Sequence, residues 1–285
     1  MIMNGRHTTY IFLLVAAIPF LASTLISPAF AEKGFPINAK SSCISSSCHS
    51  NFSRTKKYRH EVADDERSCA MLCHQLVAEG RHEFKAMPAD ISELCLQCHD
   101  APDLKNAKPV DPAPMKLHKP VAEGKCIACH APHSVDTYRL LHRNYPEELY
   151  ASYSQKTYEL CLSCHKGMQK ALAEPRTLTS TEFRNGNLNL HYRHVNKMKG
   201  RTCRACHRHH GSPNPKLIAN TFTLGAKTIR MKYEKTGTGG SCATACHIPV
   251  KYDRCEPEEN MILTTPREGS DAAGDALKRA CGKNQ

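Results

Sequence analysis

The residues best suited to chemistry are pairs of cysteines that are each followed at once by a histidine. In a Cys-x-x-Cys-His run the two thiols can bind covalently to the edge of a porphyrin, and the histidine can bind its iron, so the pattern is typical of haem c attachment. Two residues separate the cysteines in four runs, three in two runs and four in the first run. The seven runs are Cys43…Cys48-His49, Cys69…Cys73-His74, Cys95…Cys98-His99, Cys126…Cys129-His130, Cys161…Cys164-His165, Cys203…Cys206-His207 and Cys242…Cys246-His247.

Cysteine pairs also occur in two kinds of site that hold no haem. They build structural zinc sites, and in a cysteine-rich secreted chain they can form a framework of disulfides. Neither requires a histidine directly after the second cysteine of every pair, so the pattern favours seven covalently attached haems. A strong Soret absorption band would distinguish haem from zinc.

The runs are organised as a repeat. His60, His118 and His194 each precede the next cysteine by eight or nine residues, and each opens a unit that contains two runs. The second and third units also share a Cys-His-x-x-His extension. We therefore divide the chain into a signal peptide (1–31), a single-run segment (32–57), three doubled modules (58–100, 117–166 and 191–254), a linker (101–116), a connector (167–190) and a tail (255–285).

Further histidines can bind the opposite faces of the irons. Seven irons with two imidazoles each need seven of them, and nine remain outside the signal and the runs: His60, His82, His118, His133, His142, His191, His194, His209 and His210. Methionines are an alternative, but Met71, Met168 and Met198 show no repeated spacing.

The most economical ligand assignment is local. It gives each doubled module its opening histidine and one internal histidine, namely His60 with His82, His118 with His133 and His194 with His210. The leading run then takes His142 or His191, and His209 is left for the surface or a propionate. Ligation by two imidazoles predicts low-spin irons with low reduction potentials.

The repeats resemble a known family. The segment LHKPVAEGKCIACHAPH, followed by LCLSCH, resembles the doubled Cys-x-x-Cys-His motif family of multihaem cytochromes c. RTCRACHRHH with GGSCATACH is similar to the closing unit of such proteins in metal-reducing bacteria. The resemblance covers about residues 58–254 and implies electron transfer in the periplasm or at the cell surface. The wider cysteine gaps depart from the family spacing.

The first 31 residues are typical of a secretory signal. They carry Arg6, an apolar run over 10–18 and the cleavage-site sequence Ala29-Phe30-Ala31. We therefore expect the mature chain in the periplasm, at the cell surface or secreted, in a Gram-negative bacterium. The alternative, an uncleaved membrane anchor, is disfavoured because Pro19 and Pro28 interrupt the apolar run.

The formal net charge of +12 does not indicate a nucleic-acid partner. Removing Arg6 leaves +11, and two propionates on each of seven haems would bring the total to about −3, if all ionise. The basic residues are therefore better understood as counterions of the cofactors than as a phosphate-binding patch.

The polypeptide offers little for an ordinary core, since its mean hydropathy is −0.50 and it has no tryptophan. We expect a mostly irregular fold with short α-helices, in which the haems form the core, and one small β-hairpin. A helix is predicted over 145–172 and the hairpin over 221–234, around Gly225. Cys255 and Cys281 lie outside the runs and are expected to form a disulfide, the alternatives being free or intermolecular thiols.

These features favour an electron carrier with no catalytic residue. Without residues 1–31 the 285-residue chain offers only about 36 residues to each run, too few to insulate the haems from one another. The expected partners are a quinol-oxidising membrane cytochrome and other periplasmic or outer-membrane cytochromes, with an outer-membrane conduit, a filament or a mineral as acceptor. The alternative is a multihaem reductase of small oxyanions, which needs one open iron position. Polymerisation into a haem filament, with the leading run ligated by another chain, is compatible with an electron carrier.

Overall fold

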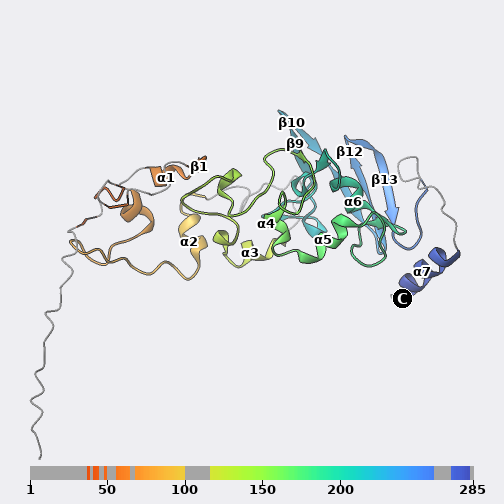
Figure 1. Cartoon of the computed structure of the whole chain (residues 1–285), viewed down its shortest axis with the longest axis horizontal. Coiled ribbons are helices and arrows are strands. Elements are labelled where there is room, and N and C mark those ends of the chain that lie inside the picture. Colours follow the sequence, from red (N-terminus) through yellow and green to blue (C-terminus); the bar gives the residue numbers. More distant parts are fainter. Residues whose placement is uncertain are drawn as a thin grey trace, which may run out of the picture.

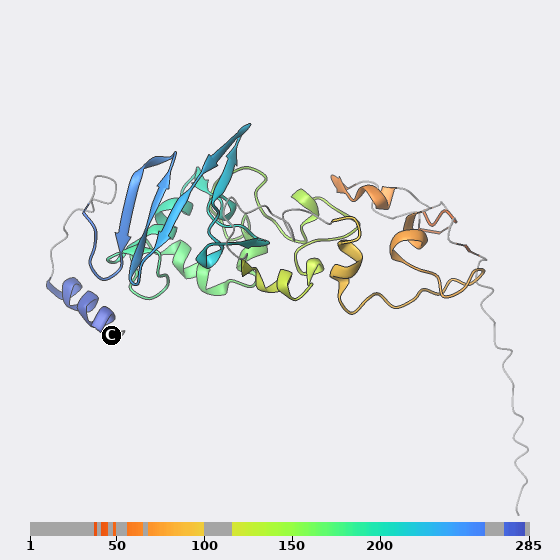
Figure 2. The same ribbon diagram turned by 180° about the vertical axis from the view of Figure 1, so that it is seen from behind.

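The computed structural model describes residues 37–38, 41–44, 48–49, 56–64, 68–99, 116–259 and 271–282. The molecule is elongated, and its segments follow one another along the long axis in sequence order, from α1 (Glu61–Asp64) near one end to α7 (Asp271–Gly282) at the other (Figure 1, Figure 2). The expected signal peptide and nearly all of the linker 101–116 lie outside the described residues.

The helices are short, and several coincide with attachment runs. Besides α1 and α7 they are α2 (Ile91–Cys95), α3 (Lys119–Ala122), α4 (Glu159–Leu162), α5 (Lys166–Ala173) and α6 (Leu190–Val195), with single turns η1 (Cys69–Cys73), η2 (Cys126–Ala128), η3 (Tyr138–Leu140), η4 (Cys203–Ala205) and η5 (Pro215–Leu217). The histidine of a run leaves the helical conformation; His165, for example, has φ −87° and ψ 56° between α4 and α5. A run therefore limits the length of the helix that carries it.

The strands form small antiparallel sheets. The two-stranded pairs are β1 (Tyr58–Arg59) with β3 (Ser134–Val135), β2 (Lys116–Leu117) with β8 (Gly211–Ser212), β4 (Tyr150–Ala151) with β7 (Gly200–Arg201), β5 (Arg184–Asn185) with β6 (Leu188–Asn189), and β9 (Thr221–Leu224) with β10 (Lys227–Arg230). A three-stranded sheet has the order β11 (Lys232–Lys235), β12 (Gly239–Thr244), β13 (His247–Asp253).

Two of the strand pairs join each module to the next. The strand before His60 pairs with the strand after His133, and the backbone N–H of His60 donates to the carbonyl of His133 at 2.8 Å. The strand before His118 pairs in the same way with the strand after His210, with an N–H to carbonyl distance of 2.9 Å. Successive modules are therefore interlocked through equivalent hydrogen bonds.

The predicted secondary structure is correct in part. The hairpin predicted over 221–234 is confirmed over 221–230 as β9 and β10, which turn at Gly225 with φ +58°. Its last residues, 232–234, instead belong to β11 and pair with β12. The helix predicted over 145–172 is wrong in its first half, because Tyr150 and Ala151 pair with the strand at Gly200 and Arg201. The three-stranded sheet was not predicted. Short helices and irregular chain are confirmed as the main features of the described residues.

Buried apolar side chains gather in the C-terminal half of the molecule. One cluster contains Tyr158, Leu162, Leu172 and Val195. The second contains Leu190, Val250 and Tyr252. Among the described residues before 100, only Ile44 and Ala70 are buried hydrophobics. The polypeptide thus forms a small core of its own at one end and almost none at the other.

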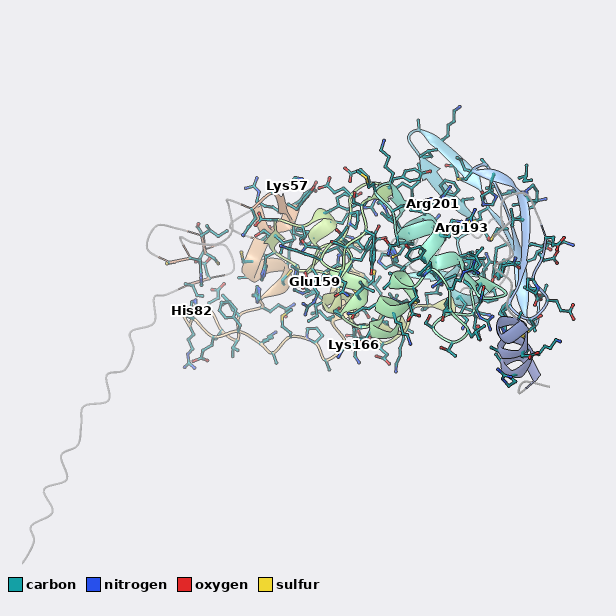
Figure 3. All side chains as sticks on the ribbon, turned by 45° about the vertical axis from the view of Figure 1, so that its right-hand side comes forward. Lys57, His82, Glu159, Lys166, Arg193 and Arg201 are labelled. Atoms are coloured by element: carbon teal, nitrogen blue, oxygen red, sulfur yellow. A yellow bond between two sulfur atoms is a disulfide. The ribbon has the colours of Figure 1, made fainter. Side chains whose placement is uncertain are left out.

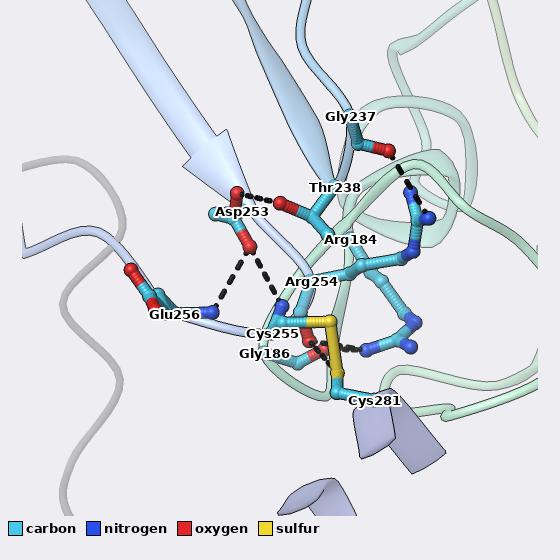
Figure 4. The surroundings of a disulfide bond; sticks show 9 residues. All are labelled: Arg184, Gly186, Gly237, Thr238, Asp253, Arg254, Cys255, Glu256 and Cys281. Atoms are coloured by element: carbon cyan, nitrogen blue, oxygen red, sulfur yellow. Dashed lines mark hydrogen bonds between the residues drawn. A yellow bond between two sulfur atoms is a disulfide. The ribbon is translucent and has the colours of Figure 1, made fainter. Parts of the chain in front are cut away.

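The expected disulfide between Cys255 and Cys281 is confirmed. It joins the end of α7 to the segment after β13, across a sequence separation of 26 residues. Arg184 donates to the carbonyls of Gly186 and Arg254 beside it (Figure 4). The tail is therefore attached to the C-terminal sheet. In the part of the chain described, no helix is long and apolar enough to cross a membrane.

Candidate functional site: opposed histidines along one cavity

Six attachment runs are closed by the same backbone hydrogen bond. The N–H of the histidine donates to the carbonyl of the first cysteine, whatever the gap between the cysteines. The pairs are His49 with Cys43 (3.1 Å), His74 with Cys69 (2.7 Å), His99 with Cys95 (2.8 Å), His130 with Cys126 (3.1 Å), His165 with Cys161 (2.9 Å) and His207 with Cys203 (2.8 Å). In the Cys69 run a π-helical turn takes up the extra residue. The wider gaps therefore keep the cysteines and the histidine together.

The last run is built differently. Cys242 lies in β12 and His247 in β13, and Thr244 pairs with His247 across the turn between them. A β-hairpin, rather than a helical turn, therefore brings this histidine back beside its cysteines.

Each run histidine has a second histidine near it. The distances between ring centroids are 6.2 Å for His49 and His82, 5.8 Å for His99 and His60, 5.9 Å for His74 and His133, 6.0 Å for His165 and His118, and 6.2 Å for His130 and His210. For the last two runs, His191 lies close enough to His207 to interact electrostatically with it, and His194 lies close enough to His247.

The ring separations fit a haem iron between the imidazoles. Two imidazoles on opposite sides of one iron have ring centres about 6 Å apart, because each metal–nitrogen bond is about 2 Å long and each nitrogen lies about 1 Å from its ring centre. Four of the five measured pairs are also nearly parallel, with interplanar angles of 13° to 28°. Among the described residues, no group of three or more His, Cys, Asp or Glu side chains converges as a bare zinc ion would require.

The leading run differs from the sequence-based expectation. His82, not His142 or His191, lies opposite His49, near the N-terminal end of the molecule (Figure 3). The chain folds back after η1, since Leu76 and Phe84 form an antiparallel bridge. A turn at Gly80, with φ +81°, presents His82 to the leading segment.

The internal histidines of the second and third modules also lie opposite a run histidine of the preceding module. His133 of the second module lies opposite His74 of the first, and His210 of the third lies opposite His130 of the second. The local assignment of these residues is therefore wrong. The opening histidines do stay local, since His60 lies opposite His99 and His118 opposite His165.

His142 and His209 do not face a run histidine in this way. His142 is exposed beside His130. The ring of His209 contacts Tyr145 edge-to-face at 5.5 Å, and its accessible surface faces the cavity described below. Burial lowers the pKa of His209 to about 4.

Backbone carbonyls orient several of the imidazoles. Nδ1 of His130 lies 3.1 Å from the carbonyl of Arg139, and Nδ1 of His207 lies 2.9 Å from that of Lys216. A proton on Nδ1 that is donated to this carbonyl leaves Nε2 as the free ligand atom. Arg139 and Lys216 both have positive φ, 54° and 56°, a conformation that costs about 1 kcal/mol or more in a non-glycine residue.

Sequence reasoning missed these carbonyls, although a signal was present. Arg139-Leu140-Leu141 and Lys216-Leu217-Ile218 each begin six residues after the second histidine of a Cys-His-x-x-His extension. The same strained turn thus recurs at the equivalent place in two modules.

Helix α6 presents His191 and His194. Asn189, which is fully buried, caps the helix by accepting from Tyr192 and donates to the carbonyls of Ala171 and Glu174. Burial lowers the pKa of His191 to about 3 and that of His194 to about 4. Neutral imidazole is the form that binds a metal.

The cysteines give the order of the sites. Those of neighbouring modules lie close together in three pairs, Cys43 with Cys69, Cys95 with Cys126, and Cys161 with Cys203. Within each module, a cysteine of the first run lies close enough to a cysteine of the second run to interact electrostatically. These pairs are Cys73 with Cys98, Cys129 with Cys164, and Cys206 with Cys242. The seven runs therefore form a single file in sequence order. Burial and Cys126 raise the pKa of the Cys95 thiol to about 11.

One continuous cavity of about 2920 Å³ connects the runs. Small-molecule sites usually measure about 300–1,000 Å³, so this cavity has room for several large groups. It is lined by cysteines and histidines from all seven runs, together with the histidines that face them.

A comparison with protein families matches the description "Doubled CXXCH motif" over residues 118–170 and 194–227. These segments contain both runs of the second module and the first run of the third. No curated protein and no solved structure matches the chain.

Proposed function

We propose that the chain carries electrons through seven covalently bound haems between redox proteins outside the cytoplasm. Its residues 118–170 and 194–227 match the doubled CXXCH motif, and multihaem c-type cytochromes with this motif transfer electrons. The observation that carries the proposal is the single file of opposed imidazoles, with ring centres about 6 Å apart.

The polypeptide binds the haems and orients the imidazoles that ligate their irons. The fourteen run cysteines attach the porphyrins, and each run histidine binds one iron on one side. We assign the second imidazoles to His82, His133, His60, His210, His118, His191 and His194, in the order of the runs. Each bound haem iron supplies one-electron exchange between Fe(III) and Fe(II), and no side chain forms or breaks a bond.

Contacts between modules support fast transfer along the file. The neighbouring cysteines Cys43 and Cys69, Cys95 and Cys126, and Cys161 and Cys203 would bring the edges of neighbouring porphyrins together. We infer that electrons pass from site to site along the long axis. A quinol-oxidising membrane cytochrome or another periplasmic cytochrome is the donor we propose, with an outer-membrane cytochrome, a filament or a mineral as acceptor.

The test is to count the haems and examine their ligation in the purified protein. We expect a mass increase of seven haems over the cleaved chain, and low-spin ferric signals throughout the electron paramagnetic resonance (EPR) spectrum. A colourless protein, or one with fewer haems, would contradict the proposal as stated.

The second candidate function, a reductase of small oxyanions, needs an iron with one open position. The supply of opposed imidazoles favours the carrier. Binding of carbon monoxide or nitrite at one haem per chain, with a stoichiometric high-spin signal, would instead establish the reductase.

His82 lies opposite His49 within the same chain, so the proposal does not need a second chain for the leading haem.

A further inference from the structure

The charges of the chain are distributed unevenly along its length. Residues 32–115 carry 11 Lys and Arg against 12 Asp and Glu, a net charge of −1, and contain three runs. Residues 116–285 carry 27 against 15, a net charge of +12, and contain four runs. With two ionised propionates per haem, the two parts would carry about −7 and +4. The described residues alone carry a net charge of −1 over 37–99 and +11 over 116–282. Because the described segments follow the long axis in sequence order (Figure 1), these charges lie toward opposite ends.

Part of the basic excess faces the cavity and part does not. Lys119, Lys125, Arg139, Arg201 and Arg204 are among the basic residues that line the cavity, where they can neutralise propionates. A second group is exposed and lies outside the cavity lining. This group, which we call the basic face, consists of Arg230, Lys232 and Lys251.

The basic face lies against the last attachment run. Lys232 is paired with Ala243 and Lys251 with Ser241, so both lysines project from one face of the three-stranded sheet. Cys242 projects from the other face, which lines the cavity. One sheet layer therefore separates the lysines from the site of His247. Arg230 ends β10 and Lys232 begins β11, and both are exposed on either side of the buried Met231.

Charged residues on edge strands also prevent sheets from pairing with one another. That role needs charge of either sign. On this surface the three residues of the basic face are accompanied by one acidic side chain, Glu234, which lies on the same face of the sheet as Lys232. A single-sign surface beside a terminal redox site suits recognition of a partner of opposite charge.

We propose that the basic face is the docking surface for an acidic redox protein, which exchanges electrons with the haem held by His194 and His247. The proposal rests on the proposed electron-carrier function. A protein is favoured over a membrane or a nucleic acid because the face adjoins the last redox site, and only a redox partner exchanges an electron there.

The test uses the reduced holoprotein and two small redox probes at low ionic strength. Hexacyanoferrate(III), an anion, takes one electron from an Fe(II) of the protein, giving Fe(III) and hexacyanoferrate(II), and no proton moves. Hexaammineruthenium(III) accepts one electron in the same way but is a cation. Stopped-flow absorbance follows both reactions.

The variant R230E/K232E/K251E reverses the basic face. We expect its reaction with hexacyanoferrate(III) to be about tenfold slower, since steering by surface charge changes association rates by about 10- to 1,000-fold. Its reaction with hexaammineruthenium(III) should not slow. The matched control K116E/K156E/K166E makes the same change in net charge at exposed lysines outside the cavity lining, and should alter the hexacyanoferrate(III) rate by less than about twofold. Unchanged absorption spectra and melting temperatures establish that both variants fold.

Equal slowing by the two variants, or slowing by neither, would overturn the docking surface. Co-sedimentation of the protein with phosphatidylglycerol vesicles that is lost in R230E/K232E/K251E would also overturn it, in favour of a membrane surface. In each of these results the protein still exchanges electrons. A haem-free protein, or one that reacts with neither probe, would contradict the electron-carrier function itself.

Discussion

His82 and His142 are two histidines outside the attachment runs that the chain uses differently. His82 has its ring centroid 6.2 Å from that of His49, at an interplanar angle of 24°. His142 is exposed, and its backbone N–H donates to the carbonyl of Cys129. Residue type alone does not distinguish them. The difference lies in the turn at Gly80, which returns the chain to the leading segment.

This difference predicts the effect of replacing each residue. His82→Ala should convert one iron of seven to a high-spin form, because it loses its second strong ligand. His82→Met should keep the iron low-spin and raise the potential of one haem, since a thioether favours Fe(II) more than an imidazole does. EPR and a spectroelectrochemical titration measure both effects. His142→Ala is the control and should change neither; a high-spin signal from the control alone would refute the assignment.

The attachment residues could be predicted from the sequence, but most of the ligand pairs could not. A run needs only local spacing, and the hydrogen bond from His74 to Cys69 shows that even a three-residue gap is accommodated. The partner of His74 is His133, 59 positions further along the sequence. That pairing depends on the interlock of β1 with β3, which contains only two residues per strand and has no distinct sequence pattern.

Among the elements, α6 connects the polypeptide core to two of the sites. It lies between the two apolar clusters, contributing Val195 to one and Leu190 to the other. Phe183 packs against the rings of both His191 and His194, at 5.1 and 5.8 Å. The helix is only six residues long, so its position depends on its cap and on tertiary contacts rather than on helix propensity.

Asn189→Ala tests this dependence. The variant loses the cap and leaves the carbonyls of Ala171 and Glu174 without their donor, which should cost about 2–4 kcal/mol of unfolding free energy. We expect a lower melting temperature and weakened ligation at the irons of His207 and His247, seen as high-spin EPR intensity.

The control for that helix is Asn187→Ala. The Asn187 side chain accepts a hydrogen bond from Arg176, a contact in which Arg176 is exposed, and its loss should cost under about 1 kcal/mol. If Asn189→Ala lowered the melting temperature without any high-spin intensity, α6 would be a structural element that does not position the ligands.

Prediction of the elements succeeded where local turn chemistry dominates and failed where distant strands pair. Gly225 sits between two alternating segments, and the hairpin forms there. The segment 145–158 has helix-forming glutamates, yet Leu149 accepts a hydrogen bond from Thr202 and Tyr150 pairs with Arg201. In β13 the buried Val250 and Tyr252 do alternate with exposed Lys251, but Pro249 and the nearby attachment run obscure this pattern.

For the whole molecule, the two ends differ in how much of an apolar core the polypeptide forms from its own side chains. The apolar clusters lie in 158–252. In the described residues of 68–99, exposed apolar side chains such as Leu72, Phe84 and Met87 line the cavity. They would be covered when the porphyrins are bound, so the sequence-based expectation of a haem core applies most strongly at this end.

Removing haems from each end should therefore have different consequences. Replacing the six cysteines of the first three runs by alanine should leave 68–99 without a core, because burial of apolar surface is the main favourable term in folding. We expect a protease of broad specificity to cut this segment rapidly while 158–252 stays intact, as mass spectrometry of the fragments would show.

Replacing Cys242 and Cys246 is the matched change at the other end. There Leu190, Val250 and Tyr252 still pack together, so 232–253 should stay resistant. Equal protection of both segments, or cleavage of the C-terminal sheet alone, would show that the polypeptide and not the cofactor supports the N-terminal modules.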